Sequence, residues 1–411
     1  MEEFTELLKP VRIHRNNNAD LEVRNRWVVQ PMEQLPYDFQ SRRVHPDSIN
    51  WYKSVARGGA GLIIVEASYV MPEGRGIEGQ LVINQDHTQG IEQIVSAIKE
   101  ENPKSVVFVQ LSHSGHLVDP KFWAVKRVHP PTSWDHADGP ILKTDEIKEI
   151  IEAYIVAVQI IKNAGADGVD VKASHGYLGL QFLRPLNQRT DGYGGNLEGR
   201  TAFHREIIKG IRQKSPELAI MTRLSMQEGA LGENGILVDT NDYEPMNGCF
   251  GTDSCHDSKY NPERSAEVIR SLVAMGVNII NISAGNVLAS VLAIQPKRGN
   301  IEINPSDTST YLNYHHITNA KYAVEVISSI GASIPVIASG FSVFGKNMAY
   351  VAENVLNLGY ADMAGIGRQS LINPDIHDIM SGKGPFCEVC DKCLRLLVDS
   401  KPVHCVTKYG E

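Results

Sequence analysis

The chain has 411 residues, 42% of them hydrophobic and 21% charged, which is typical of a soluble globular protein with room for one large barrel or two domains. Its net charge of −8 argues against a nucleic-acid binder, which would carry a basic face. No apolar run reaches the roughly 20 residues that span a membrane, and the acidic start MEEFTELLKP is unlike a secretory signal, so we expect a cytoplasmic protein.

Short apolar runs alternate with amphipathic, helix-like stretches along most of the chain. The eight expected strands are Trp27–Gln30, Gly61–Val65, Ser105–Gln110, Gly168–Val171, Ala219–Leu224, Val277–Ile282, Pro335–Ala338 and Met363–Gly365. The clearest expected helices are Asp145–Ala164, with Thr144 as its N-cap, Arg200–Lys214, Asn261–Met275 and Asn313–Ile330. Continuous apolar strands separated by helices favour a parallel sheet covered by helices. Eight such units predict an α/β fold of the (β/α)₈ TIM-barrel type, with catalytic groups at the carboxyl ends of the strands.

A doubly wound sheet is the alternative fold, but no expected strand is followed by a full G-x-G-x-x-G turn with an acidic partner downstream. We expect residues 1–380 to form the barrel and residues 381–411 to form a cysteine-rich C-terminal extension. Residues 229–260 are polar, rich in Gly and Asn, and longer than a usual loop. They predict either a lid over one face of the barrel or a plain surface insertion.

Three chemically functional side chains follow directly on the fourth expected strand. Lys172, His175 and Tyr177 fall within six residues at the junction of strand and loop. Such residues at the carboxyl end of a barrel strand are typical of an active-site rim. The alternative is a buried strand whose polar residues close a loop.

The segment from Gly168 to Arg200 resembles the signature of the old yellow enzyme family of FMN-dependent oxidoreductases. The matching residues are Gly176, Tyr177, Leu178, Gln181, Phe182, Leu183, Arg189, Thr190, Asp191, Tyr193, Gly194 and Gly195. The resemblance runs from about Leu7 to Asp375. It implies a barrel that binds FMN and uses NADH or NADPH to reduce the C=C bond of an α,β-unsaturated carbonyl or enoyl substrate, and it leaves the choice of nicotinamide and of substrate open.

The resemblance also implies roles for the residues after the fourth strand. Tyr177 matches the proton donor of the family, and His175 matches a donor to the substrate's carbonyl oxygen, where negative charge accumulates as hydride arrives. Lys172 departs from the family, since it stands where the first histidine usually sits. Its ammonium is expected to bind an enolate oxygen or anionic ligand, or else to pair with a nearby carboxylate without catalysing.

Residues at the other strand ends resemble the flavin-binding positions of the family. They are Pro31, Met32 and Glu33 after the first strand, Ala67 after the second, Gln110 on the third, Arg223 on the fifth, Ser339 and Gly340 after the seventh, and Gly367 and Arg368 after the eighth. An amide such as Gln110 can both donate and accept at the pyrimidine edge of a flavin. Arg223 would stabilise the negative charge of the reduced flavin. The Gly-bearing turns, with the guanidinium of Arg368, form the expected phosphate site.

Glu33 is a second departure, because the family usually places Thr or Cys at this position beside the ring. A carboxylate there disfavours the anionic reduced flavin. We therefore expect slower flavin reduction than in a Thr-bearing relative.

Four cysteines mark the C-terminal extension: Cys387, Cys390, Cys393 and Cys405. Close thiolates of this kind are typical metal ligands. The segment resembles the iron–sulfur segment of 2,4-dienoyl-CoA reductase and trimethylamine dehydrogenase, although one gap is a residue shorter here. A [4Fe–4S] cluster, a structural zinc ion and free thiols are the open alternatives.

Two rival functions remain open at this stage. One is an aldolase-like barrel in which Lys172 forms a Schiff base with a carbonyl substrate. The other is a relative that binds flavin or a cluster without catalysis. We expect a small-molecule substrate and neither a nucleic acid nor a membrane as partner, and the oligomeric state is open between a monomer and a homo-oligomer.

Overall fold

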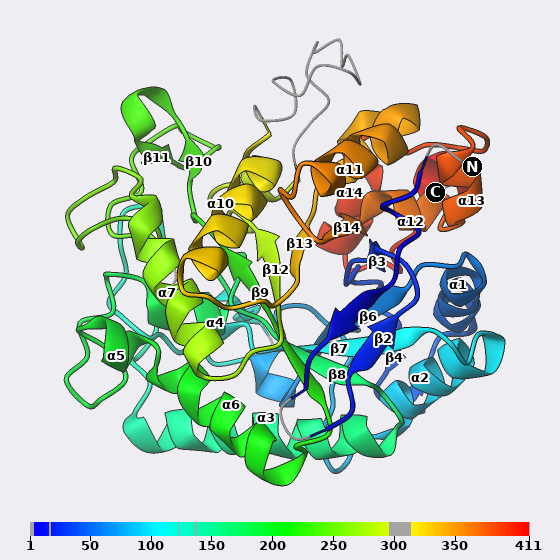
Figure 1. The fold of residues 1–411 in the computed structure, drawn as a ribbon. Coiled ribbons are helices and arrows are strands. Elements are labelled where there is room, and N and C mark those ends of the chain that lie inside the picture. Colours follow the sequence, from blue (N-terminus) through cyan, green and yellow to red (C-terminus); the bar gives the residue numbers. More distant parts are fainter. Residues whose placement is uncertain (1–3, 16–17, 122, 136–137, 296–313, 411) are drawn as a thin grey trace.

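A closed barrel of eight parallel strands forms the centre of the protein (Figure 1). This computed structural model describes residues 4–15, 18–121, 123–135, 138–295 and 314–410. The barrel strands are β3 (Trp27–Val29), β6 (Leu62–Tyr69), β7 (Val106–Ser112), β8 (Gly168–Val171), β9 (Ala219–Ser225), β12 (Ile279–Ser283), β13 (Val336–Ala338) and β14 (Met363–Ile366). They neighbour one another in chain order, and β14 pairs with β3 to close the ring. The (β/α)₈ prediction is confirmed.

The second barrel strand is longer than the sequence indicates. It was expected to end at Val65, but β6 continues to Tyr69. Its register against β7 shifts between Val65 and Ser68, which is where the regular pairing is interrupted. A bulge re-aims the side chains beyond it, and Tyr69, at the end of β6, contacts both Glu33 after the first strand and Tyr177 after the fourth.

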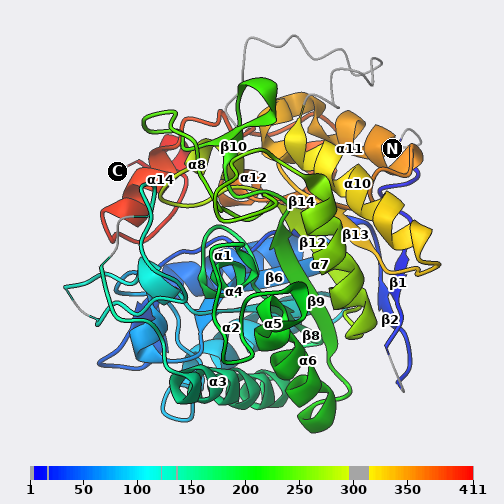
Figure 2. The same cartoon turned by 90° about the vertical axis from the view of Figure 1, so that its left-hand side faces the viewer.

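Helices lie outside the ring of strands in both views (Figures 1 and 2). The longer ones are α1 (Pro46–Arg57), α2 (Gln89–Glu101), α3 (Thr144–Asn163), α6 (Ala202–Lys214), α7 (Pro262–Ala274), α10 (His315–Ser329) and α11 (Met348–Asn357). Shorter ones are α4 (Leu178–Leu183), α5 (Leu197–Arg200), α8 (Val291–Ile294), α12 (Arg368–Ile372) and α13 (Ile376–Met380). Single 3₁₀ turns cover Pro72–Gly74, Gly115–Leu117 and Glu233–Gly235, and a longer, kinked 3₁₀ segment covers Phe341–Asn347.

Two helix starts expected from the sequence involve Thr144 and Asn313. The prediction that Thr144 caps α3 is wrong, since Thr144 is its first residue and Lys143 is the N-cap. The carboxylate of Glu146 accepts from the Lys143 backbone N–H instead, and the Thr144 hydroxyl donates to Asp191. Asn313, the expected first residue of α10, lies outside the described residues.

Two apolar layers hold the barrel together. The inner layer contains Val28, Leu62, Ile64, Val106, Phe108, Ala219, Met221, Ile279, Ile337 and Met363. The hairpin of β1 (Val11–Ile13) and β2 (Leu21–Val23) packs on this inner layer and so covers the amino ends of the strands. The outer layer lies between the strands and the helices. Because the amino end is covered, the open mouth is at the carboxyl ends.

The expected insertion contains the short strands β10 (Ala230–Leu231) and β11 (Leu237–Val238), which pair with each other. Leu237, Met246 and Cys249 of the insertion form a separate small core with Trp134 and Ala289. A third small hairpin joins β4 (Tyr37–Asp38) to β5 (Arg43–Val44). The insertion is therefore anchored to the barrel by apolar packing.

The C-terminal extension carries two short helices, α14 (Lys392–Val398) and α15 (Val406–Tyr409). It lies beside α12 in both views (Figures 1 and 2). Leu396, Val403 and Val406 pack on Leu371 of α12 and on partly buried Trp51 of α1. Within the described ranges, no helix is both long and apolar enough to cross a lipid bilayer.

Candidate active site

A cavity of about 370 Å³ opens at the carboxyl ends of the barrel strands, a size within the range of small-molecule sites. It brings together most of the residues that the sequence singled out: Pro31, Met32, Glu33, Gln110, Lys172, His175, Tyr177, Arg223, Ser339, Gly340, Gly367 and Arg368. These residues come from six of the eight barrel strands or the turns that follow them. The chain therefore places its predicted groups at one site.

Ala67 is the exception among the predicted residues. Its side chain is buried in a small apolar cluster with Tyr69 and Val82, against which Tyr177 packs, and it is not among the described residues that line the cavity. The cause is the continuation of β6 beyond Val65, which keeps Ala67 inside the strand. The expected contact between Ala67 and a flavin stays a prediction.

Glu33 and Lys172, the two departures from the family, lie against each other. Lys172 Nζ is 3.9 Å from Glu33 Oε1, and their side chains are only 5% and 11% exposed. The ammonium also lies over the ring of Tyr177, 3.6 Å from its centroid. Burial lowers the pKa of Lys172 to about 8, with Glu33 opposing the shift and Arg223 adding to it. Each of the two charges is thus largely compensated by the other.

Tyr69 links Tyr177 to Glu33. Tyr177 packs against the cluster that contains Tyr69, and each hydroxyl affects the pKa of the other, while Tyr69 donates to Glu33 Oε1 at 3.1 Å. Gln80 Nε2 donates to Glu33 Oε2 at 2.8 Å and to the Tyr69 oxygen at 3.1 Å, which fixes both. Burial raises the pKa of Tyr177 above its ordinary value, and the carboxylate of Glu33 adds to this. A phenolate at Tyr177 would therefore take up a proton readily from any donor that reached it.

The turn between β8 and α4 holds His175 in an unusual backbone conformation. Its φ is 61°, and that of Gly176 is 83°, both in the left-handed region. The backbone N–H of His175 donates to Ser225 Oγ, and its ring Nε2 lies 2.7 Å from Ser283 Oγ. Burial, then the nearby Arg223, lowers the pKa of His175 well below its ordinary value. The imidazole is therefore neutral at pH 7.

Asp170 is a buried acid inside β8 that joins two expected flavin contacts. It accepts from Gln110 Nε2 and from the backbone N–H of Arg223, both at 2.7 Å. Burial raises the pKa of Asp170, and Gln110 and Arg223 oppose this. Burial lowers the pKa of Arg223 to about 10, so the guanidinium is still charged at pH 7. Asp170 thus holds an amide and a cation in fixed positions at the cavity.

A second amide network closes the opposite side of the cavity. Gln30 Nε2 donates to Ser339 Oγ at 2.9 Å and to Asn281 Oδ1 at 3.1 Å, while Asn281 Nδ2 donates back to Gln30 Oε1. Gln30 and Ser339 both line the cavity. The network ties β3, β12 and β13 together where the phosphate loop is expected.

The C-terminal extension forms part of the cavity wall. Its residues in the lining are Cys393, Leu394, Leu397, Val398 and Val403. Arg368 Nη1 donates to Asp391 Oδ1 at 2.7 Å, so the expected phosphate ligand is held by the extension. Side chains more than 20 residues apart in sequence therefore complete this end of the site.

The four cysteines of the extension line one small void of about 20 Å³ together with Arg368 and Asp391. All four are free thiols. Burial raises the pKa of Cys387 and raises that of Cys393 to about 11. Across the described parts of the chain, no group of three or more His, Cys, Asp or Glu side chains has a metal-binding arrangement. The expected iron–sulfur cluster is therefore not supported by the positions of these thiols.

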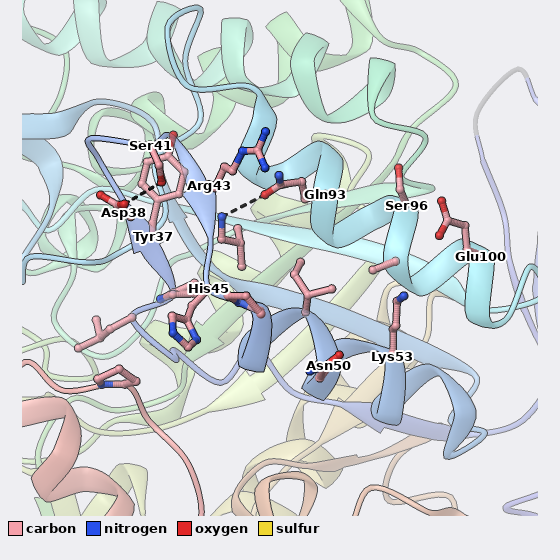
Figure 3. A pocket seen from close by; sticks show the side chains of 17 residues that line it. Tyr37, Asp38, Ser41, Arg43, His45, Asn50, Lys53, Gln93, Ser96 and Glu100 are labelled. Carbon is pink, nitrogen blue, oxygen red and sulfur yellow. Dashed lines mark hydrogen bonds between the residues drawn. The ribbon is translucent and has the colours of Figure 1, made fainter.

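A second hollow, of about 770 Å³, lies on the surface away from the barrel mouth (Figure 3). Figure 3 shows it between the β4–β5 hairpin and helices α1 and α2, with Arg43, His45, Lys53 and Glu100 around it. The two dashed hydrogen bonds in that view, from Ser41 to Asp38 and from the Val44 backbone to Gln93, join residues that line the hollow. Its described lining shares no residue with the predicted site.

Several residues of the site were not singled out from the sequence. Tyr69 and Gln80 are among them, as are Asp170, Ser283 and the side chains of the extension other than Cys393. Asp170 did carry a signal, because an acid inside an apolar strand must have a partner. Tyr69 and Gln80 carried none, since they reach Glu33 only through the bulge in β6 and the segment after it.

The donor set of the cavity fits FMN. Buried Arg223 Nε has no hydrogen-bond partner among the described residues, which is expected of a donor that serves a ligand. Gln110 supplies an amide beside it, and Arg368 supplies a cation at the turn after β14. An amide and a cation at one end and a second cation at the other match a flavin ring and its phosphate group.

Comparisons with known proteins place the chain in a family. The family model described as "NADH:flavin oxidoreductase / NADH oxidase family" matches residues 6–248, more than half of the chain. An NADPH dehydrogenase of Halalkalibacterium halodurans is 37% identical over 52% of this chain and 62% of its own length. A metal reductase of Desulforamulus reducens is 31% identical over 94% of this chain and 52% of its own length. The chain thus spans less than two thirds of these two relatives.

The solved structure of morphinone reductase has the same fold, with a TM-score of 0.65, 20% identity, and coverage of 93% of this chain and 92% of that one. The match of the family model decides the classification, because it covers the strands that carry Glu33, Gln110, Lys172 and Arg223. The chain belongs to the NADH:flavin oxidoreductase / NADH oxidase family.

Proposed function

We propose that this protein is an FMN-dependent oxidoreductase that uses NADH or NADPH to reduce the C=C bond of an α,β-unsaturated carbonyl or enoyl substrate. One observation carries the proposal: the cavity at the barrel mouth contains both the donor set for a flavin and the trio Lys172, His175 and Tyr177. The names of the relatives, which include dehydrogenases and a reductase, agree with a redox role.

The residues that would hold FMN divide into two groups. Gln110 and Arg223, both fixed by Asp170, would bind the pyrimidine edge of the ring. Ser339, Gly340, Gly367 and Arg368 would bind the phosphate. The chemistry that FMN supplies when bound is hydride transfer, from the nicotinamide to the β-carbon of the substrate.

The side chains of the trio would act on the substrate itself. The Tyr177 hydroxyl would give its proton to the α-carbon, and its high pKa keeps it protonated at neutral pH. His175 would donate to the carbonyl oxygen as a neutral imidazole, oriented by Ser283. The ammonium of Lys172 lies over the Tyr177 ring and stabilises negative charge at that end of the cavity.

Anaerobic spectroscopy tests the proposal. Protein loaded with FMN should lose its yellow colour when titrated with NADH or NADPH and regain it when an enone is added. Tyr177→Phe should be reduced at the wild-type rate but reoxidised by the enone about 100-fold more slowly, because it lacks the acid. A protein that binds no FMN, or one that no enone in a panel reoxidises, would rule the function out.

A Schiff-base function is the second candidate, because burial lowers the pKa of Lys172 to about 8 and so makes its free amine more available. The ion pair with Glu33 opposes it, since Glu33 favours the ammonium. Borohydride treatment with a carbonyl compound would attach that compound to Lys172 if this function were correct. A Lys172→Met control would then remain unlabelled.

The extension raises the remaining question about cofactors. Purification without oxygen, followed by assays of iron, sulfide and zinc, decides between a cluster, a metal ion and free thiols. We propose that the flavin site alone accounts for the activity. We also infer a cytoplasmic location, because the six described cysteines are all free, as is usual in a reducing compartment.

A further inference from the structure

The reaction proposed above leaves Tyr177 without its proton after each turnover, and the route by which it regains one is an open step. The side chain of Tyr177 is partly buried and lines the cavity. Tyr69 approaches it from the end of β6, and Glu33 lies beyond Tyr69, at the turn after β3.

We propose that Tyr69 and Glu33 form a proton relay that returns a proton to Tyr177, with the ammonium of Lys172 as its source. This rests on the proposed function, in which Tyr177 is the acid. Four oxygen or nitrogen atoms lie in sequence: Lys172 Nζ, Glu33 Oε1, Tyr69 Oη and Tyr177 Oη. Tyr69 and Glu33 act only through Tyr177 and are positioning residues in this sense.

The proton balance of the relay is closed. As the bond between Tyr177 Oη and its hydrogen breaks and the C–H bond at the α-carbon forms, the hydroxyl hydrogen of Tyr69 turns from Glu33 to Tyr177 and is transferred. Tyr69 Oη then takes a proton from Glu33 Oε1, which has taken one from Lys172 Nζ. Glu33 ends as a carboxylate, and Lys172 ends as a neutral amine that regains its proton from solvent at the cavity. No electrons move in these steps.

The geometry supports the two transfers that involve Glu33. The bond from Tyr69 to Glu33 is 3.1 Å long, and Gln80 donates to both partners, which keeps them aligned. The gap of 3.9 Å between Lys172 and Glu33 exceeds a hydrogen bond, and a torsion of the flexible lysine side chain or one bridging water closes it. A neutral amine is accessible at Lys172, because burial brings its pKa to about 8.

Other charged groups face the relay and set its energetics. Arg223 and Asp170 act on Lys172 in opposite directions, from β9 and β8 respectively. Glu66, on β6, has a pKa raised to about 8 by burial, with Glu33 adding to the rise. Glu66 is hydrogen-bonded to Tyr52 at 3.2 Å, away from Tyr177. Tyr52 and Glu66 thus form a second buried tyrosine–carboxylate pair, outside the described lining of the cavity, and provide a matched control.

The test measures continuous turnover of the FMN-loaded protein with an enone and unlabelled NAD(P)H, in mixtures of H₂O and D₂O, so that the return of a proton to Tyr177 contributes to the rate. Wild-type protein should give a curved dependence on the deuterium fraction, since more than one proton moves. Tyr69→Phe should slow turnover by about 10- to 100-fold and give a straight line for one proton, with the rate of flavin reduction by NAD(P)H unchanged. Tyr52→Phe should keep the curved dependence and stay within about twofold of the wild-type rate.

A readout without cofactor separates the relay from the proposed function. The pKa of Lys172, followed by nitrogen NMR in the cofactor-free protein, should fall below about 8 in Glu33→Gln, because the carboxylate supports the ammonium. An unchanged Lys172 pKa, or a Tyr69→Phe protein with wild-type rate and curvature, would overturn the relay. A wild-type protein that no enone reoxidises would overturn the proposed function instead.

Discussion

Lys172 and Glu33 form a buried ion pair across the mouth of the barrel, with 3.9 Å between Nζ and Oε1. They are also the two positions at which the chain departs from the old yellow enzyme pattern, where a histidine and a neutral residue are usual. The two departures from the family pattern therefore concern one pair of contacting residues. The carboxylate that would oppose a reduced flavin lies beside an ammonium that offsets it.

A joint change predicts strong coupling between the two positions. Glu33→Gln and Lys172→Met should each destabilise the protein, because each leaves a buried charge without its partner. The double variant should be more stable than the sum of the single effects predicts, with a coupling free energy of about 1–3 kcal/mol. Urea unfolding of all four proteins measures this. Effects that add to within about 0.5 kcal/mol would mean that the pair contributes little.

The pH dependence of stability should carry the signature of Lys172. Its folded-state pKa of about 8 lies below the ordinary value of 10.5, so between these values the unfolded chain binds a proton that the folded chain does not. Stability relative to Lys172→Met should therefore rise from about pH 8 to about pH 10.5, by up to about 3 kcal/mol. Below about pH 8 the difference between the two proteins should be constant. A difference that falls with rising pH would contradict the buried ammonium.

The backbone of the turn after β8 allows a comparison of two glycines. Gly176 has φ of 83°, and a Cβ there would lie 2.4 Å from Asn286 Nδ2, which is itself held by Glu228 at 2.8 Å. Gly192 has φ of 92° with no atom within 4 Å of such a Cβ.

Gly192→Ala should lower the free energy of unfolding by about 1 kcal/mol through backbone strain alone. Gly176→Ala should lower it by about 1–3 kcal/mol more, and should also reduce the enone reoxidation rate by displacing His175. Thermal unfolding and stopped-flow kinetics of the two variants check this. Equal losses of unfolding free energy in both variants would show that the Asn286 side chain moves aside to make room for the new Cβ at position 176.

The phosphate role of Arg368 can be separated from its contact with the extension. Arg368→Met should weaken FMN binding by about 10- to 100-fold, the value of a charge-assisted contact, and leave riboflavin binding unchanged. Asp391→Asn removes the partner at 2.7 Å but keeps the guanidinium. It should not weaken FMN binding, because it removes a negative charge that faces the phosphate. Fluorescence titration with both flavins gives the four dissociation constants, and loss of riboflavin binding in Arg368→Met would point to a collapsed wall instead.

The sequence was sufficient for the barrel and for the location of the site. Apolar runs at regular intervals predicted all eight strands. Polar groups at or just after the carboxyl ends of the strands, such as Arg223 and Lys172, lie at one mouth because parallel strands all end there. Both the fold and the clustering of the site residues follow from the local sequence pattern and from the rule that parallel strands of a barrel end at the same mouth.

Contacts that depend on irregular backbone could not be predicted in this way. The bulge in β6 moves Tyr69 to Glu33 and keeps Ala67 out of the cavity, and alternating apolar residues give no sign of it. The pairing of Arg368 with Asp391 depends on how the extension folds back over α12. The sequence offered a carboxylate partner for Lys172 as one alternative, but only the structure identifies it as Glu33.

The most direct test of the account is the position of the label after enone reduction in D₂O. Wild-type protein loaded with FMN and supplied with unlabelled NADPH or NADH should yield a product with deuterium at the α-carbon, from Tyr177, and unlabelled hydride at the β-carbon. Mass spectrometry and proton NMR of the product show both positions. An unreduced enone, or a borohydride-trapped carbonyl adduct on Lys172 in its place, would contradict the account.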